Sequence, residues 1–233
     1  HDELRPAAQI AVKAIYAQAK GDTDTADDLS EQLIRTPIST HADSHVWAAG
    51  VIAAALHGYL TGTVDDGAQP VGLVQQMCAR SDSLHVETNH LMCLSLALLS
   101  RAGQSPVLAS FLLGHVSEAL GGIPGALSSG GSRSARANAA IRAAAGLCIL
   151  TMGDVRTGAR LLLDLVESND AAAMPLVTGL IGAELARLEL ESGSREAASH
   201  WIERTSRFAK RYGSQMPVQV ITRMRQGLPK SAE

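Results

Sequence analysis

Five glycines recur along this chain at nearly constant spacing, and each one separates two apolar, helix-like stretches. They are Gly21, Gly62, Gly103, Gly153 and Gly193, and their separations are 41, 41, 50 and 40 residues. A fixed period of this size is typical of stacked helical hairpins. We therefore expect an all-α fold of about five antiparallel helix pairs, followed by a capping helix that spans about residues 218–226.

The longest interval between these glycines contains an insertion. Residues 121–132 are rich in Gly, Ser and Pro, and removing about ten residues there restores the period. A run of this composition is typical of a flexible loop rather than a helix. No stretch alternates with period two, so the sequence predicts no sheet. We expect a single helical-repeat domain over residues 1–233.

Composition limits both the kind of core that the chain can form and the kinds of partner that it can bind. Apolar residues make up 46% of the chain and aromatic residues only 3%, so the core should consist mainly of Ala, Leu, Val and Ile. The net charge of −3 indicates neither a nucleic-acid partner nor an anionic membrane surface. The most apolar run, residues 46–60, is shorter than the ~20 residues that cross a bilayer.

Three cysteines, Cys78, Cys93 and Cys148, form no CxxC motif, and their odd number leaves at least one unpaired. This pattern does not predict a disulfide framework. Each cysteine lies inside an apolar helical stretch, where a free thiol acts as a small hydrophobic group. A reducing cytosol fits best, and we expect a cytoplasmic protein.

Small residues flank most of the turns at fixed distances. Seven residues before the turn glycine and five residues after it stand Ala14 and Ala26, Ala55 and Gly67, Gly146 and Gly158, and Ala186 and Ala198. Such residues let the two helices of a hairpin approach closely, and the pattern resembles the tetratricopeptide repeat. The third pair breaks it with Leu96 and Leu108, which predicts a register shift of one residue. The resemblance implies a right-handed α-α superhelix, although the period is longer than the family's and its large aromatic positions are mostly absent.

A narrower resemblance rests on Ala-rich pairs with turns such as Met-Gly-Asp-Val-Arg-Thr-Gly-Ala, residues 152–159. These pairs are similar to the helical sensor region of LuxR/MalT-type bacterial transcription regulators. In that family an ATPase module precedes the array and a helix-turn-helix follows it. The chain holds no GxxxxGK[ST] loop, and it does not begin with Met. The resemblance therefore implies the ligand- or partner-sensing part of a longer protein, without direct nucleic-acid contact.

The tetratricopeptide resemblance also implies a groove lined by the first helix of each pair. Carried over residue by residue, it gives the candidate binding residues Ile52, Leu56, Tyr59, His90, Cys93, Arg101, Leu147 and Arg187, together with Gln18, Ser100 and Leu150. This set is mostly apolar with isolated basic residues. It favours a small apolar or amphipathic ligand, or an amphipathic helix of a partner protein, with a homodimer among the expected assemblies. We expect no cofactor.

Histidines offer the main alternatives. His41 and His45 lie four residues apart and could begin a zinc site, but such a site needs further ligands, and no Glu follows His41 as HExxH requires. We expect no metal. Three arginines, Arg204, Arg207 and Arg211, share one helix face and should be solvated. The sequence thus predicts a non-enzymatic binding or sensing module. A protein-interaction adaptor, and an enzyme with His57 or His90 as its base, remain alternatives.

Overall fold

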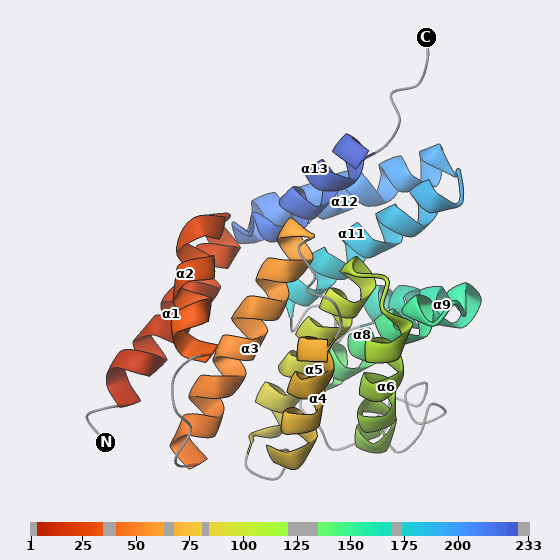
Figure 1. Ribbon diagram of the computed structural model, residues 1–233. Coiled ribbons are helices and arrows are strands. Elements are labelled where there is room, and N and C mark those ends of the chain that lie inside the picture. Colours follow the sequence, from red (N-terminus) through yellow and green to blue (C-terminus); the bar gives the residue numbers. More distant parts are fainter. Residues whose placement is uncertain are drawn as a thin grey trace.

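The computed structural model describes residues 4–34, 41–62, 68–80, 84–120, 135–168 and 174–227. These residues contain eleven helices and no strand, which confirms the all-α fold class (Figure 1). The predicted insertion, residues 121–132, lies outside the described residues. The helices in chain order are α1 (Leu4–Lys20), α2 (Thr23–Ile34), α3 (His41–Thr61), α4 (Ala68–Arg80), α5 (Val86–Ala102), α6 (Pro106–Leu120), α8 (Ala135–Thr151), α9 (Val155–Glu167), α11 (Pro175–Glu191), α12 (Arg195–Tyr212) and α13 (Met216–Gly227).

Four of the five recurring glycines end helices in the left-handed conformation. Gly21, Gly62, Gly153 and Gly193 have φ angles of 85°, 76°, 98° and 83°. At three of these turns the next residue donates its N–H to the carbonyl five residues earlier, as Asp154 does to Ile149 at 3.1 Å. This is the Schellman arrangement, which satisfies carbonyls left free at a helix end and favours glycine. The period in the sequence is therefore a period of helix C-termini.

The third turn confirms the predicted register shift. Gly103 has a φ of −84°, and Gln104 takes the left-handed conformation instead, with a φ of 48°. Counted from Gln104, the residues seven before and five after are Ala97 and Ala109, and both have 0% exposure. The third hairpin thus has small buried residues at the same two places as the first, fourth and fifth hairpins, displaced by one residue.

Side-chain caps begin the second helix of three pairs. Asp22 accepts a hydrogen bond from the Thr25 N–H at 3.2 Å, and Ser105 accepts from Leu108 at 3.3 Å. Asp154 accepts from the Thr157 N–H at 3.0 Å, which holds the pKa of its carboxyl below the ordinary value. A left-handed residue followed by an oxygen-bearing cap therefore stops one helix and starts the next within two positions.

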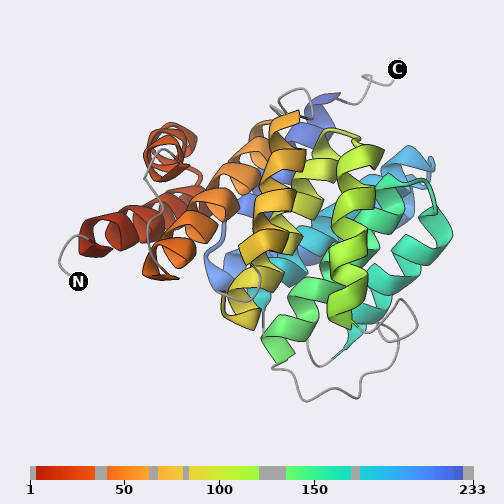
Figure 2. The same cartoon turned by 60° about the horizontal axis from the view of Figure 1, so that its bottom comes forward.

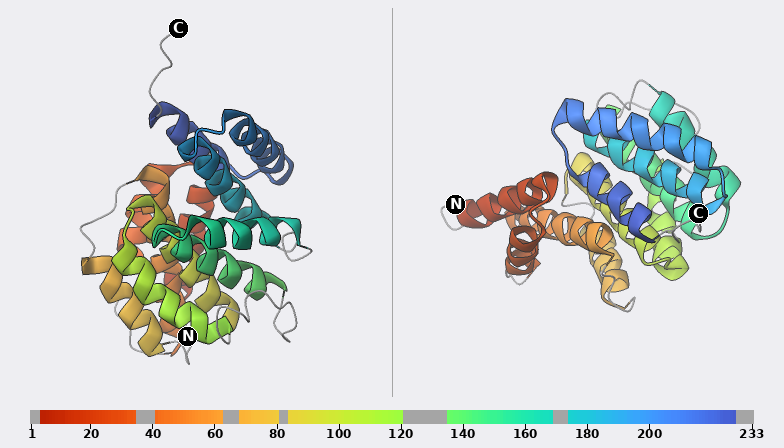
Figure 3. Two further views of the ribbon diagram at one scale, coloured as in Figure 1. Left: turned by 90° about the vertical axis from the view of Figure 1, so that its right-hand side faces the viewer. Right: turned by 90° about the horizontal axis from the view of Figure 1, so that it is seen from above.

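The first helices of the first four pairs, α1, α3, α5 and α8, lie side by side in chain order, and α5 packs between α3 and α8. In Figure 2 the first four hairpins follow one another across the molecule, from the red α1 to the teal α9, and the blue C-terminal helices are seen behind them. One apolar cluster extends from α3 to α13, whereas α1 joins α3 through a separate small cluster of Ala14, Val46 and Ala53. Figure 3 shows the α1–α2 hairpin projecting from the rest. A right-handed superhelix of the tetratricopeptide kind stays a prediction.

None of the helices described here is long and apolar enough to cross a membrane. The capping helix exists as predicted, but α13 does more than cover α12. It also contacts α11, α1 and α3, so the last helix reaches back to the first two hairpins. Figure 1 shows it beside α12, across the upper end of α3.

We expect Gly158→Ala to destabilise the fold, because α8 and α9 touch at this position. A Cβ on Gly158 would lie 2.8 Å from the Gly146 carbonyl oxygen, which belongs to the backbone and cannot swing aside. Overpacking of this kind lowers the free energy of unfolding by about 1–3 kcal/mol. Urea denaturation measures this loss.

The matched control is Gly114→Ala in α6. A Cβ there would meet nothing within 4 Å, and Gly114 is exposed inside a helix. We expect a gain of about 0.5–1 kcal/mol, because alanine loses less backbone entropy than glycine. Equal effects of the two substitutions would contradict the close contact between α8 and α9.

Candidate functional site

A buried carboxylate, Glu184 of α11, lies at the centre of a polar cluster between helices of different hairpins. Glu184 has 0% exposure. The Tyr59 hydroxyl of α3 donates to its Oε1 at 2.7 Å, and the Arg187 guanidinium donates to its Oε2. Arg101 of α5 brings its Nε to 3.5 Å from the same Oε2. Side chains from three hairpins therefore converge on one carboxylate.

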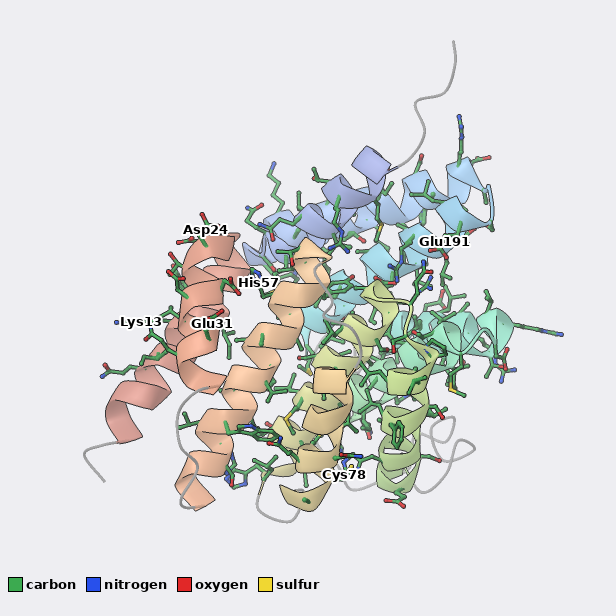
Figure 4. The ribbon with its side chains drawn as sticks, in the orientation of Figure 1. Lys13, Asp24, Glu31, His57, Cys78 and Glu191 are labelled. Carbon is green, nitrogen blue, oxygen red and sulfur yellow. The ribbon has the colours of Figure 1, made fainter. Side chains whose placement is uncertain are left out.

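A second carboxylate, Glu191, completes the cluster at its outer edge. Its side chain is 49% exposed and ends α11, where Figure 4 labels it. Oε2 of Glu191 accepts from the Arg101 Nη2 at 2.8 Å, and Oε1 lies 3.7 Å from the Arg187 Nε. We call Tyr59, Arg101, Glu184, Arg187 and Glu191 the Glu184 network. Its two guanidinium groups balance its two carboxylates.

Burial and neighbouring charge set the protonation states in the Glu184 network. Burial, followed by the negative charge of Glu184, raises the pKa of Tyr59 well above its ordinary value, so the phenol remains a donor. Burial disfavours the charged form of Arg187, but Glu184, Tyr59 and Glu191 outweigh that effect and raise its pKa. The hydrogen bonds from these donors and the two guanidinium charges stabilise a carboxylate that would otherwise be costly to bury.

The last helix attaches to the same end of α3. Arg223 of α13 donates from Nη1 to the Tyr59 carbonyl oxygen at 2.6 Å, and its guanidinium carbon lies 6.0 Å from the centre of the Tyr59 ring. Gln219 donates from Nε2 to the Gly21 carbonyl at 3.2 Å. Tyr59 is therefore bound at both ends, by Glu184 through its hydroxyl and by Arg223 through its carbonyl.

The structure brings three of the predicted groove residues together and leaves the others apart. Tyr59, Arg101 and Arg187 meet in the Glu184 network. The apolar candidates are packed inside the main core cluster: Ile52, Leu56, Cys93 and Leu147, with Leu150. Ser100 donates to the Ala97 carbonyl at 2.9 Å and is fully buried. The side chain of Gln18 lies outside the described residues, and a role in ligand contact stays a prediction for the whole set.

Sequence reasoning missed Glu184, Glu191 and Arg223. One signal was present for Glu184, because it is an acidic residue in the apolar run of residues 180–186, with an arginine three positions later. A charged residue on the buried face of a helix is rare unless it is paired. Its partners lie up to 125 residues away in the chain, so the pairing itself could not be predicted from local spacing.

The histidines have separate environments. His90 is buried, and its Nδ1 lies 2.9 Å from the Ala137 carbonyl, so it ties α5 to α8. His57 faces α2, where its Nε2 is 3.5 Å from Asp27 (Figure 4). His45 packs against His85 with 4.9 Å between ring centres. The described residues contain no group of three or more His, Cys, Asp or Glu that could hold a metal.

The exposure of the cysteines and of the C-terminal arginines differs in part from the sequence prediction. Cys93 and Cys148 are buried, and burial raises the pKa of both thiols, so neither is poised as a nucleophile. Cys78 is exposed on α4, which corrects the prediction that all three are interior hydrophobic groups (Figure 4). Arg207 is exposed as predicted, whereas Arg204 packs its guanidinium 5.0 Å from the centre of the Trp201 ring.

No family model, no curated protein and no solved structure matches this chain. The resemblance to tetratricopeptide arrays and to LuxR/MalT-type regulators therefore rests on the residues quoted above.

We expect Glu184→Ala to be among the most destabilising substitutions in the chain. It would leave the Tyr59 hydroxyl without its acceptor and would remove the buried negative charge that Arg187 and Arg101 face, at a cost of about 3–5 kcal/mol in the free energy of unfolding. Glu203→Ala is the control, because Glu203 and Arg207 form an ion pair with side chains 71% and 70% exposed. Such an exposed pair is worth at most about 1 kcal/mol. Urea denaturation of both variants tests this order, and comparable losses would contradict it.

The raised pKa of Tyr59 predicts a loss of stability in alkaline solution. A free tyrosine titrates near pH ~10, so the unfolded chain loses this proton while the folded chain retains it. The contribution of the phenol is complete below about pH 10 and falls as pH rises from there towards the folded pKa. We expect the stability advantage of the wild type over Tyr59→Phe to shrink above about pH 10. Urea titrations of both proteins measure it, and a constant advantage would contradict the raised pKa.

Proposed function

We propose that this chain is a non-enzymatic binding or sensing module, the ligand- or partner-binding helical-repeat region of a bacterial transcription regulator. The observation that carries the proposal is the convergence of α3, α5 and α11 on Glu184. These helices belong to the second, third and fifth pairs of the array. The Glu184 network therefore depends on how the early and late hairpins are placed relative to one another.

Sensing requires two arrangements that a ligand distinguishes. In the described arrangement Arg101 and Arg187 hold both carboxylates, and Glu191 lies at the solvent edge. A ligand that contacts these helices with higher affinity when the hairpins shift would move the equilibrium by its difference in affinity for the two arrangements. The predicted readout is a change in superhelix pitch or in self-association.

A protein-interaction adaptor is the second candidate. Two large apolar side chains on the projecting α1, Val12 and Tyr16, are 69% and 62% exposed one helical turn apart. An exposed apolar pair of this kind supports contact with another protein more directly than it supports a small ligand. An enzyme with an oriented histidine has weaker support, from the 3.5 Å approach of His57 to Asp27.

Native mass spectrometry of the full chain, purified from cells, tests the sensing proposal. We expect a co-purifying small molecule or second subunit, because ligands stabilise the state they bind, by about 2.7 kcal/mol at a hundred-fold excess over Kd. The extra mass should be reduced in Arg187→Ala and retained in Arg207→Ala, whose guanidinium is exposed on α12. A ligand-free monomer in all three proteins would contradict the proposal.

A further inference from the structure

The projecting α1–α2 hairpin separates its charges completely between its two helices. Helix α1 contains Arg5, Lys13 and Lys20 and no acidic residue, whereas α2 contains four acidic residues and no basic one. Surfaces of opposite charge attract each other, and juxtaposed like charges are costly. The hairpin therefore sets a positive helix beside a negative one.

The exposed side of α1 also carries apolar side chains. Val12 and Tyr16 lie one turn apart and are 69% and 62% exposed. Lys13 and Lys20 are exposed at three- and four-residue steps from Tyr16, so all four residues share one face of the helix, which we call the α1 stripe. The Lys20 Nζ lies 5.5 Å from the centre of the Tyr16 ring, and Lys13 points away from the rest of the molecule in Figure 4.

The acidic residues of α2 form a second stripe. They follow steps of three and four residues, are all exposed, and make up the α2 stripe: Asp24, Asp27, Asp28 and Glu31. Asp27 approaches His57 of α3 at 3.5 Å. Among the described side chains, neither Lys13 nor Lys20 forms an ion pair with α2. Ion pairing inside the hairpin therefore does not account for the separation of charge.

The position of the hairpin leaves both stripes accessible. It joins α3 through the small cluster of Ala14, Val46 and Ala53, apart from the main core, and Figure 3 shows it projecting. The end units of helical arrays normally have a polar outer face. Val12 and Tyr16 depart from this rule, and exposed apolar surface with a polar rim is typical of an interaction site.

We propose that a second copy of this chain docks on the α1–α2 hairpin, and that the two hairpins form a four-helix bundle about a two-fold axis. In such a contact both copies use the same surface. Each α1 stripe faces the partner's α2 stripe, so the lysines meet carboxylates and the apolar pair is covered in both copies. Packing α1 on α1 would bring lysines together, and packing α2 on α2 would do the same to carboxylates.

The separation of charge favours a second copy over another kind of partner. A uniformly basic partner is repelled by α1, and a uniformly acidic one is repelled by α2, whereas a copy supplies both signs. The inference rests on the proposed function and names the surface through which self-association would report ligand binding. Asp27 of the α2 stripe approaches His57, at the same end of α3 as Tyr59, so the dimer contact lies near the Glu184 network.

Charge reversal in the full chain tests the pairing. One variant carries Lys13→Glu with Lys20→Glu, and the other carries Asp24→Lys, Asp28→Lys and Glu31→Lys. We expect the wild type to dimerise and each variant alone to dimerise at least about a hundred-fold more weakly, because like charges then face each other. An equimolar mixture should form a heterodimer, since each stripe again faces the opposite charge. Sedimentation equilibrium measures all four samples, and recovery in the mixture cannot arise from a misfolded variant.

The apolar pair has a matched control on α6. Tyr16→Ser should weaken the dimer about thirty-fold, as loss of a central aromatic side chain does at an interface. Phe111→Ser should leave it unchanged, although Phe111 is 52% exposed and lies one turn after the exposed Val107. A monomeric wild type, a mixture that stays monomeric, or equal weakening by the two substitutions would overturn the inference. A monomeric wild type would assign the α1 stripe to an occupant other than a second copy.

These outcomes are separable from those of the proposed sensing function. A ligand-bound monomer in native mass spectrometry would retain the sensing function and reject the hairpin dimer. A ligand-free dimer that charge reversal abolishes and Arg187→Ala leaves unchanged would do the reverse.

Discussion

The carboxylate of Glu184 has no exposed surface, and moving such a charge out of water costs several kcal/mol unless donors replace the lost hydration. Tyr59 of α3 and Arg187 of α11 donate hydrogen bonds to Glu184, and the Arg101 guanidinium of α5 adds its positive charge at 3.5 Å. The carboxylate is compensated only when all three helices are in place. This requirement fixes helices of different hairpins relative to one another, whereas each turn fixes only the two helices that it joins.

Directional contacts of this kind are needed to fix the packing register when the core consists of small aliphatic side chains. Packing between alanine-rich helices depends on apolar area and close fit, and the hydrophobic effect is itself non-directional. Hairpins with similar surfaces could therefore pack in neighbouring registers at similar free energy. A buried ion pair penalises every register that leaves a charge unpaired. We infer that the Glu184 network selects one arrangement of the second, third and fifth hairpins.

Local chemistry explains why the hairpins could be predicted from the sequence. A Schellman turn needs a left-handed residue, and glycine adopts that conformation at the least cost, so each turn leaves a visible mark. Even the irregular third turn could be anticipated, since Leu96 and Leu108 occupy positions where the other pairs have small residues. Gln104 then takes the left-handed conformation in place of Gly103. In contrast, contacts between distant hairpins have no local signature, and Arg223 and Glu191 could not be found in this way.

Tyr59 is subject both to the local chemistry of a turn and to contacts between distant hairpins. Its position near the end of α3 follows from the turn at Gly62, which also leaves its carbonyl in the last turn of the helix, within reach of Arg223. Its hydroxyl is buried and donates a hydrogen bond to Glu184. A shift of the α3 terminus would therefore alter the contact with α13 and the contact with α11 together. Both contacts are short and directional, so one cannot change without the other. The C-terminal end of α3 therefore couples the position of α13 to the hydrogen bonding of the buried Glu184 carboxylate.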